Sequence, residues 1–185
     1  MAQDPLLRAA LDCGADKAVL IGQDAIVTDP VFRSLCEANR CGAYGRCWMC
    51  PPAVGPVEEL IKKLRSYPHA LFYQSITHLE DSFDIEGMQA GKKLFNGIGQ
   101  KLLDACRPLL GADTLHLSGG GCGLCKTCAQ ADGEPCRFPD RALSSLEAYG
   151  IDVYNTSKNT GLKYVNGPDT VTYFGMILFR ERKDG

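Results

Sequence analysis

Eight of the ten cysteines in this chain fall into two tight groups, a pattern typical of metal sites. An export signal would show a basic segment followed by an apolar stretch at the N-terminus, and neither is visible there. We therefore expect a cytoplasmic protein. Thiols in a reducing compartment stay free or bind metals rather than forming a disulfide framework. The first group is Cys36, Cys41, Cys47 and Cys50, and the second is Cys122, Cys125, Cys128 and Cys136.

The second group has the stronger spacing signal. Its first three members form a C-x2-C-x2-C run, and Cys136 follows after seven intervening residues. Such a run can place three thiolates on three irons of one cluster, and ferredoxins use the same opening. Zinc sites usually pair two C-x2-C knuckles instead, which this triple run matches less well. We therefore predict a [4Fe–4S] cluster here, with zinc as the alternative.

The first group is spaced C-x4-C-x5-C-x2-C and ends at Pro51-Pro52. Paired prolines stiffen the exit of the loop, because each fixes φ and removes an N–H donor. The pattern again favours a [4Fe–4S] cluster with four cysteine ligands. Zinc is a stronger rival at this group, since Cys47-x2-Cys50 could form one knuckle and the other two cysteines the second limb.

Local sequence patterns predict the elements that must position these loops. Apolar residues at helical spacing predict helices over residues 5–13, from 57 to before Pro68, over 86–110, and from Pro139 to Gly150. Apolar or alternating runs predict strands over 17–22, 25–28, 70–76, 114–118, 151–154 and 171–179. The first two strands should form a hairpin through Gly22-Gln23-Asp24. Residues 155–166 read as a polar loop.

These elements predict an α+β protein with a mixed central sheet and helices packed on it. If helices cover both faces of the sheet, the protein has the three-layer α/β form. A length of 185 residues with no visible linker favours one domain spanning 1–185. The net charge of −2 and the scattered basic residues argue against nucleic-acid binding. No apolar run approaches the roughly 18 residues of a membrane span, so no membrane partner is expected.

Longer motifs around both cysteine groups resemble a family of unknown function, described as predicted metal-binding proteins and common in anaerobic bacteria and archaea. The similar segments run from Cys36 to Pro52, with Asn39, Gly42, Tyr44, Gly45 and Trp48 in the pattern, from Cys122 to Pro139, from Leu146 to Val153 and from Thr172 to Gly175. The resemblance implies metal binding, with iron–sulfur centres expected and no established reaction. It also implies counterparts for Cys36, Cys41 and Cys50, whereas Cys47 falls at a variable position.

Two [4Fe–4S] clusters are therefore the expected cofactors, and electron transfer to a redox partner protein is the leading function. If Cys47 is not a ligand, the first cluster keeps an open iron that could bind substrate, which would make the protein an enzyme. A structural or regulatory zinc protein is the second alternative. The sequence assigns no catalytic residue and no oligomeric state.

The remaining cysteines and the histidines receive no metal role. Cys13 and Cys106 lie on apolar helix stripes, where a lone cysteine usually packs as a small core residue. His69, His78 and His116 are dispersed and have no nucleophile or carboxylate at motif spacing. We expect them to be solvated or hydrogen-bonded.

Overall fold

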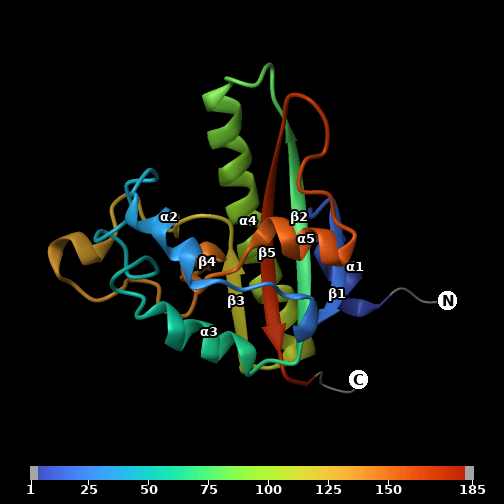
Figure 1. The fold of residues 1–185 in the computed structure, drawn as a ribbon, viewed down its shortest axis with the longest axis horizontal. Coiled ribbons are helices and arrows are strands. Elements are labelled where there is room, and N and C mark those ends of the chain that lie inside the picture. Colours follow the sequence, from blue (N-terminus) through green and yellow to red (C-terminus); the bar gives the residue numbers. More distant parts are fainter. Residues whose placement is uncertain (1–3, 182–185) are drawn as a thin grey trace.

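The computed structural model describes residues 4–181, which contain one mixed sheet of five strands (Figure 1). The spatial order is β1-β2-β5-β3-β4. All neighbours are antiparallel except β3 and β4, which are parallel. The strands are β1 (Lys17–Gly22), β2 (His69–His78), β3 (Thr114–Ser118), β4 (Ser144–Ser145) and β5 (Thr170–Phe179).

The centre of the sheet is the β2–β5 pair, which is in register over ten residues from His69 opposite Phe179 to His78 opposite Thr170. Consecutive residues of β2 enter different hydrophobic clusters: Phe72 packs on one face, and Leu71 and Tyr73 on the other. This follows from the two-residue period of a strand. The run Ala70–Tyr73 is apolar at every position, so this part of β2 must be covered on both faces, and it is.

Helices cover both faces. The face with Leu71 packs against α1 (Pro5–Asp12) and α4 (Ile85–Leu110), through residues such as Leu6, Phe95 and Leu102. The opposite face packs against α3 (Val57–Arg65), α5 (Val153–Thr160) and the 3₁₀ turn η4 (Glu147–Tyr149). The predicted α+β class with a mixed sheet is confirmed, and the helices form the outer layers of three.

The long periodic segments are confirmed as predicted. The helices near 5–13, 57–67 and 86–110 correspond to α1, α3 and α4. The strands predicted over 17–22, 70–76, 114–118 and 171–179 correspond to β1, β2, β3 and β5. These segments carry a clear apolar period over several residues, so local pattern sufficed.

The hairpin predicted between residues 17–22 and 25–28 is wrong. Residues Gln23–Ala25 form a 3₁₀ turn, and Thr28 makes an isolated bridge with Ile151 instead of pairing with β1. The edge of β1 is paired with β2. Residues 25–28 therefore do not extend the sheet beyond β1, which is its terminal strand.

Two predictions between Pro139 and Tyr154 are also wrong. The helix predicted up to Gly150 is a series of turns, in which Ser144–Ser145 add to β3 as β4. The strand predicted over 151–154 is reduced to a single bridge at Ile151, and α5 begins at Val153, because the Asp152 carboxylate caps the helix by accepting a hydrogen bond from the Asn155 N–H at 3.0 Å. Helix α5 also takes up half of the predicted polar loop.

Among residues 4–181, no helix is both long enough and apolar enough to cross a lipid bilayer.

Candidate metal centre

The first cysteine group begins on the short helix α2 (Arg33–Glu37), which carries Cys36. Arg33 is buried and holds α2 in place, since its guanidinium donates to the Ala148 carbonyl at 2.9 Å and to the Gly55 carbonyl at 2.6 Å. The loop then turns at Asn39, which has a φ of 49° and accepts a hydrogen bond from the Tyr44 N–H at 3.0 Å. Cys41 is exposed, whereas Cys47 and Cys50 are buried.

The second group follows the glycine turn Gly119–Gly121 at the end of β3. A Cβ on Gly119 would lie 3.1 Å from the Phe174 carbonyl oxygen, and one on Gly123 would lie 2.5 Å from the Asn96 side chain. These two glycines are thus explained by close packing against the protein itself. The four cysteines of this group are all partly exposed.

The two groups lie side by side beyond the β3–β4 edge of the sheet, where Figure 1 shows the loops after α2 and β3 extending away from both termini. The Trp48 indole N–H of the first loop donates to the Glu134 carbonyl of the second at 2.8 Å. A Cβ on Gly121 would lie 3.5 Å from the Cys50 sulfur. The tertiary fold therefore brings all the predicted metal-ligating cysteines into one region.

Cys47 is the residue that joins the groups. It lines a small cavity of about 20 Å³ together with Cys122, Cys125, Cys128 and Cys136. Trp48, Leu124 and Phe138 form apolar walls of this cysteine cavity. The Cys47 sulfur accepts hydrogen bonds from the thiols of Cys50 and Cys128 and from the N–H groups of Met49 and Cys122.

These hydrogen bonds set the protonation of the Cys47–Cys50 pair. The bond from the Cys50 thiol lowers the pKa of Cys47 to about 6, against the opposing effect of burial. The same bond, followed by burial, raises the pKa of Cys50. The bond between the two sulfurs therefore favours ionisation of one member of the pair, and the thiolate is the form of cysteine that binds metals.

The donor chemistry of the region suits an iron–sulfur centre, because clusters are held by cysteine thiolates. A cavity of about 20 Å³ has the volume of roughly one water molecule. A cluster would therefore need the two loops to move apart around it. In the part of the chain that the structure describes, no three or more His, Cys, Asp or Glu side chains are arranged to hold a single metal ion.

The residues without a predicted metal role lie in the body of the protein. Cys106 is buried in the cluster on the α4 face, and Cys13 packs against that cluster, as expected. His69 and His78 are exposed. His116 is buried and hydrogen-bonded to the Tyr73 hydroxyl at 2.8 Å, and burial lowers its pKa to about 3.

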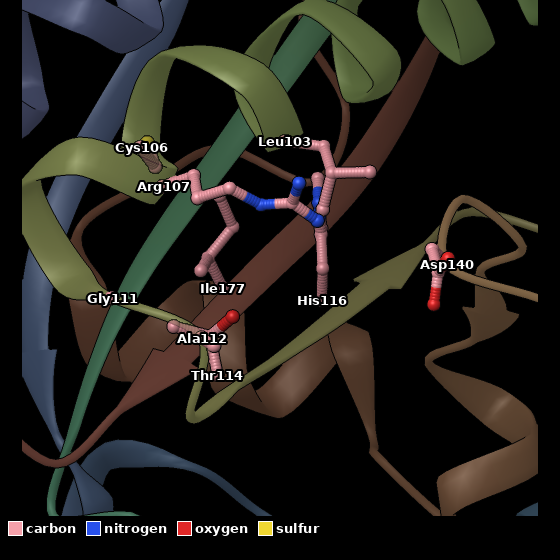
Figure 2. Close-up of a pocket in the computed structure, with 9 residues that line it drawn as sticks. All are labelled: Leu103, Cys106, Arg107, Gly111, Ala112, Thr114, His116, Asp140 and Ile177. Carbon is pink, nitrogen blue, oxygen red and sulfur yellow. The ribbon is translucent and has the colours of Figure 1, made fainter.

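A cavity of about 300 Å³ elsewhere in the protein contains none of the predicted metal ligands. Figure 2 shows it between α4 and β3, with Arg107 reaching over His116 and Asp140 on a separate loop. Its size therefore does not mark the metal centre.

Sequence reasoning missed two charged residues beside the cysteines, Lys92 on α4 and Glu147 on η4. Glu147 lies close enough to raise the pKa of Cys36, after the larger effect of burial. Burial lowers the pKa of Lys92 to about 8, and the charges of Glu147, Cys122 and Cys50, in that order, oppose the decrease. A lysine on an amphipathic helix reads as solvated, so the local pattern held no signal for Lys92.

No curated protein and no solved structure matches the chain. A protein family described as predicted metal-binding protein (DUF2284) matches residues 19–179, a range that includes both cysteine groups and nearly all of the sheet. The chain therefore belongs to the DUF2284 family of predicted metal-binding proteins.

Proposed function

We propose that the protein carries two [4Fe–4S] clusters and passes electrons to a redox partner protein. The ligands are Cys36, Cys41, Cys47 and Cys50 for the first cluster and Cys122, Cys125, Cys128 and Cys136 for the second. The observation that carries the proposal is the convergence of these thiols, which come from segments about 70 residues apart, on one region beside the sheet.

Membership of a metal-binding family supports a metal at this region. The triple C-x2-C-x2-C spacing favours iron–sulfur over zinc. All ten cysteines are free in the structure, which suits a reducing compartment such as the cytoplasm.

When bound, the clusters would supply one-electron chemistry. The chain contributes the thiolates and a partly dry environment. Trp48, Leu124 and Phe138 wall the cysteine cavity, and such apolar walls limit solvent access and so tune cluster potential. The exposed Cys41 side of the first group leaves a surface where a partner protein could approach.

The position of Cys47 favours a second candidate function. Its sulfur accepts hydrogen bonds from Cys122 and Cys128 and shares the cysteine cavity with the second group. If Cys47 serves that group or remains unligated, only Cys36, Cys41 and Cys50 hold the first cluster. One iron would then be open to substrate, and the protein would be an enzyme.

Metal analysis of protein purified without oxygen tests the main proposal. We expect about eight irons and matching acid-labile sulfide per chain, together with a brown colour. Cys125→Ser should lose about half of the iron, whereas the control Cys13→Ser should lose none, because Cys13 lies in neither group. A colourless protein with stoichiometric zinc would contradict the proposal, since Zn²⁺ has no visible charge-transfer bands.

The Cys47→Ser variant separates carrier from enzyme. If Cys47 is a ligand of the first cluster, the variant should lose iron nearly as readily as Cys50→Ser, and its paramagnetic spectrum should change. Full retention of both clusters, with spectra of the unaltered protein that respond to cyanide or a small thiol, would instead indicate an open iron.

A further inference from the structure

A second cavity, of about 250 Å³, lies next to the first cysteine group and contains no cysteine. We call it the Lys92 cavity. Lys92 of α4, Glu147 of η4 and Tyr164 contribute polar side chains, and Gly119 and Gly120 form part of its wall. Glu147 lies close enough to Cys36 to raise the pKa of that thiol, so the cavity adjoins the first group.

Lys92 enters the cavity from a largely buried position. Its ammonium group donates to the Asn96 side-chain oxygen at 2.9 Å and to the Gly119 carbonyl. An ammonium has three N–H donors, and among residues 4–181 no third acceptor is in hydrogen-bond reach of it. One donor is thus left for a ligand.

Glu147 supplies the opposite charge. In the described structure its carboxylate accepts no hydrogen bond and forms no ion pair, although it shares the cavity with Lys92. The two charges attract each other across the cavity, since Glu147 raises the pKa of Lys92 against the effect of burial, but no ion pair forms between them. A ligand with one charge of each sign would compensate both.

Most of the remaining lining is apolar or aromatic, and Thr172 adds a hydroxyl that accepts a hydrogen bond from the Asn166 side chain at 3.0 Å. The Tyr164 ring stacks on Phe174 at 5.7 Å, and Val153 also lines the cavity. The Tyr164 hydroxyl makes no hydrogen bond within the described residues, so it is a further polar contact available to a ligand. The cavity thus combines two opposite charges, the unbonded Tyr164 hydroxyl and an apolar wall; the hydroxyls of Thr172 and Tyr173 are already hydrogen-bonded within the protein.

We propose that the Lys92 cavity binds a small zwitterion of the amino-acid class, with its carboxylate on Lys92, its ammonium on Glu147 and its side chain against Val153 and Phe174. This deepens the second candidate function, the enzyme with an open iron: the ligand's role beside the cluster of the first group rests on that function, whereas its binding rests on the cavity alone. It names the class of molecule that an open iron there would meet.

Calorimetric titration of anaerobically purified protein tests this with three matched probes. L-leucine carries both charges, 4-methylpentanoate lacks the ammonium, and 3-methylbutylamine lacks the carboxylate. We expect leucine to bind at least about tenfold more tightly than either truncated probe, because each lost charge leaves a protein charge unpaired. Lys92→Met should abolish the preference for leucine over the amine, and Glu147→Gln the preference over 4-methylpentanoate.

The control Lys93→Met should keep leucine binding, since Lys93 is exposed on the same helix and does not line the cavity. If Lys92→Met fails to fold because the Gly119 contact is lost, the probe series on the unaltered protein and Glu147→Gln still decide. Equal affinity for the three probes, or no leucine binding, would overturn the proposal.

Iron and sulfide analysis of the same samples separates this proposal from the proposed function. If the protein contains iron but does not bind leucine, the cavity assignment is wrong and the cluster proposal is unaffected. Leucine binding by protein that holds no iron defeats the cluster proposal and leaves the cavity assignment standing. A Glu147→Gln variant with unchanged probe preference would also overturn the ligand assignment, whether or not its cluster spectrum changes.

Discussion

The sheet and the two cysteine-bearing segments, residues 36–52 and 119–139, differ in what holds them. In the sheet, β2 is paired on both sides, and its residues feed two hydrophobic clusters. Neither cluster contains a residue of the cysteine segments. In the described structure no side chain is buried between residues 36 and 46 or between 130 and 140. Burial stabilises the sheet, whereas the segments depend on turns, a few hydrogen bonds and, in our proposal, thiolate–metal bonds.

Removing the metal should have the largest effect, and it should act on the cysteine segments rather than on the sheet. Metal binding to such sites is coupled to folding, so chelation or exposure to oxygen should open residues 36–52 and 119–139 while the strands stay closed. In hydrogen–deuterium exchange we expect protection in the segments to fall by about 10⁴-fold or to the unfolded limit. The amides of β2 and β5 serve as the internal control. Unchanged exchange in the segments after metal loss would show that they hold themselves together.

A substitution that creates a cavity in the hydrophobic core should destabilise the sheet rather than the cysteine segments. Phe95 is fully buried between Tyr73 and Tyr173, with ring centroids 5.6 and 5.7 Å away. Phe95→Ala should lower the free energy of unfolding by about 3–5 kcal/mol, measured by denaturant titration. Iron content per folded molecule should not change.

The neighbouring Leu94 provides the matched control, because it is 68% exposed on the same helix. Leu94→Ala should change the free energy of unfolding by less than about 0.5 kcal/mol. Loss of iron from folded Phe95→Ala protein would mean that the two regions are more tightly coupled than their separate packing implies.

Acid should weaken the sheet through His116. Burial lowers the folded-state pKa of this imidazole to about 3, whereas the unfolded value is near 6.5. Between these values the unfolded chain binds the proton and the folded protein does not, so stability falls as pH falls. From pH 7 to pH 5 we expect a loss of about 2 kcal/mol attributable to His116.

Comparison of variants isolates that contribution. Unfolding curves of the unaltered protein and His116→Gln at both pH values should differ in their pH dependence by this amount. His78→Gln, at an exposed position, should behave like the unaltered protein. Equal pH dependence in all three would show that His116 is protonated in the folded state at pH 5.

Part of this structure could be predicted from the amino-acid sequence. The apolar periods of α4, β2 and β5 predict their type and nearly their bounds, because a helix or strand period repeats within a few residues. The same holds for the grouping of the cysteines, since their spacing is a property of each loop. The short segments failed: Ala25–Thr28 and Ile151–Tyr154 hold too few residues for a period to be distinctive, and their partners lie far away in the chain.

The sequence alone therefore determined the long elements, the two cysteine groups and the metal chemistry expected of their thiols. Only the tertiary structure decided that β2 pairs with β1, that Cys47 contacts Cys128, and that Lys92 and Glu147 line one cavity. Each of these pairs brings together residues about 50 or more positions apart. Such contacts depend on how sheet and helices pack as a whole, which no local period encodes.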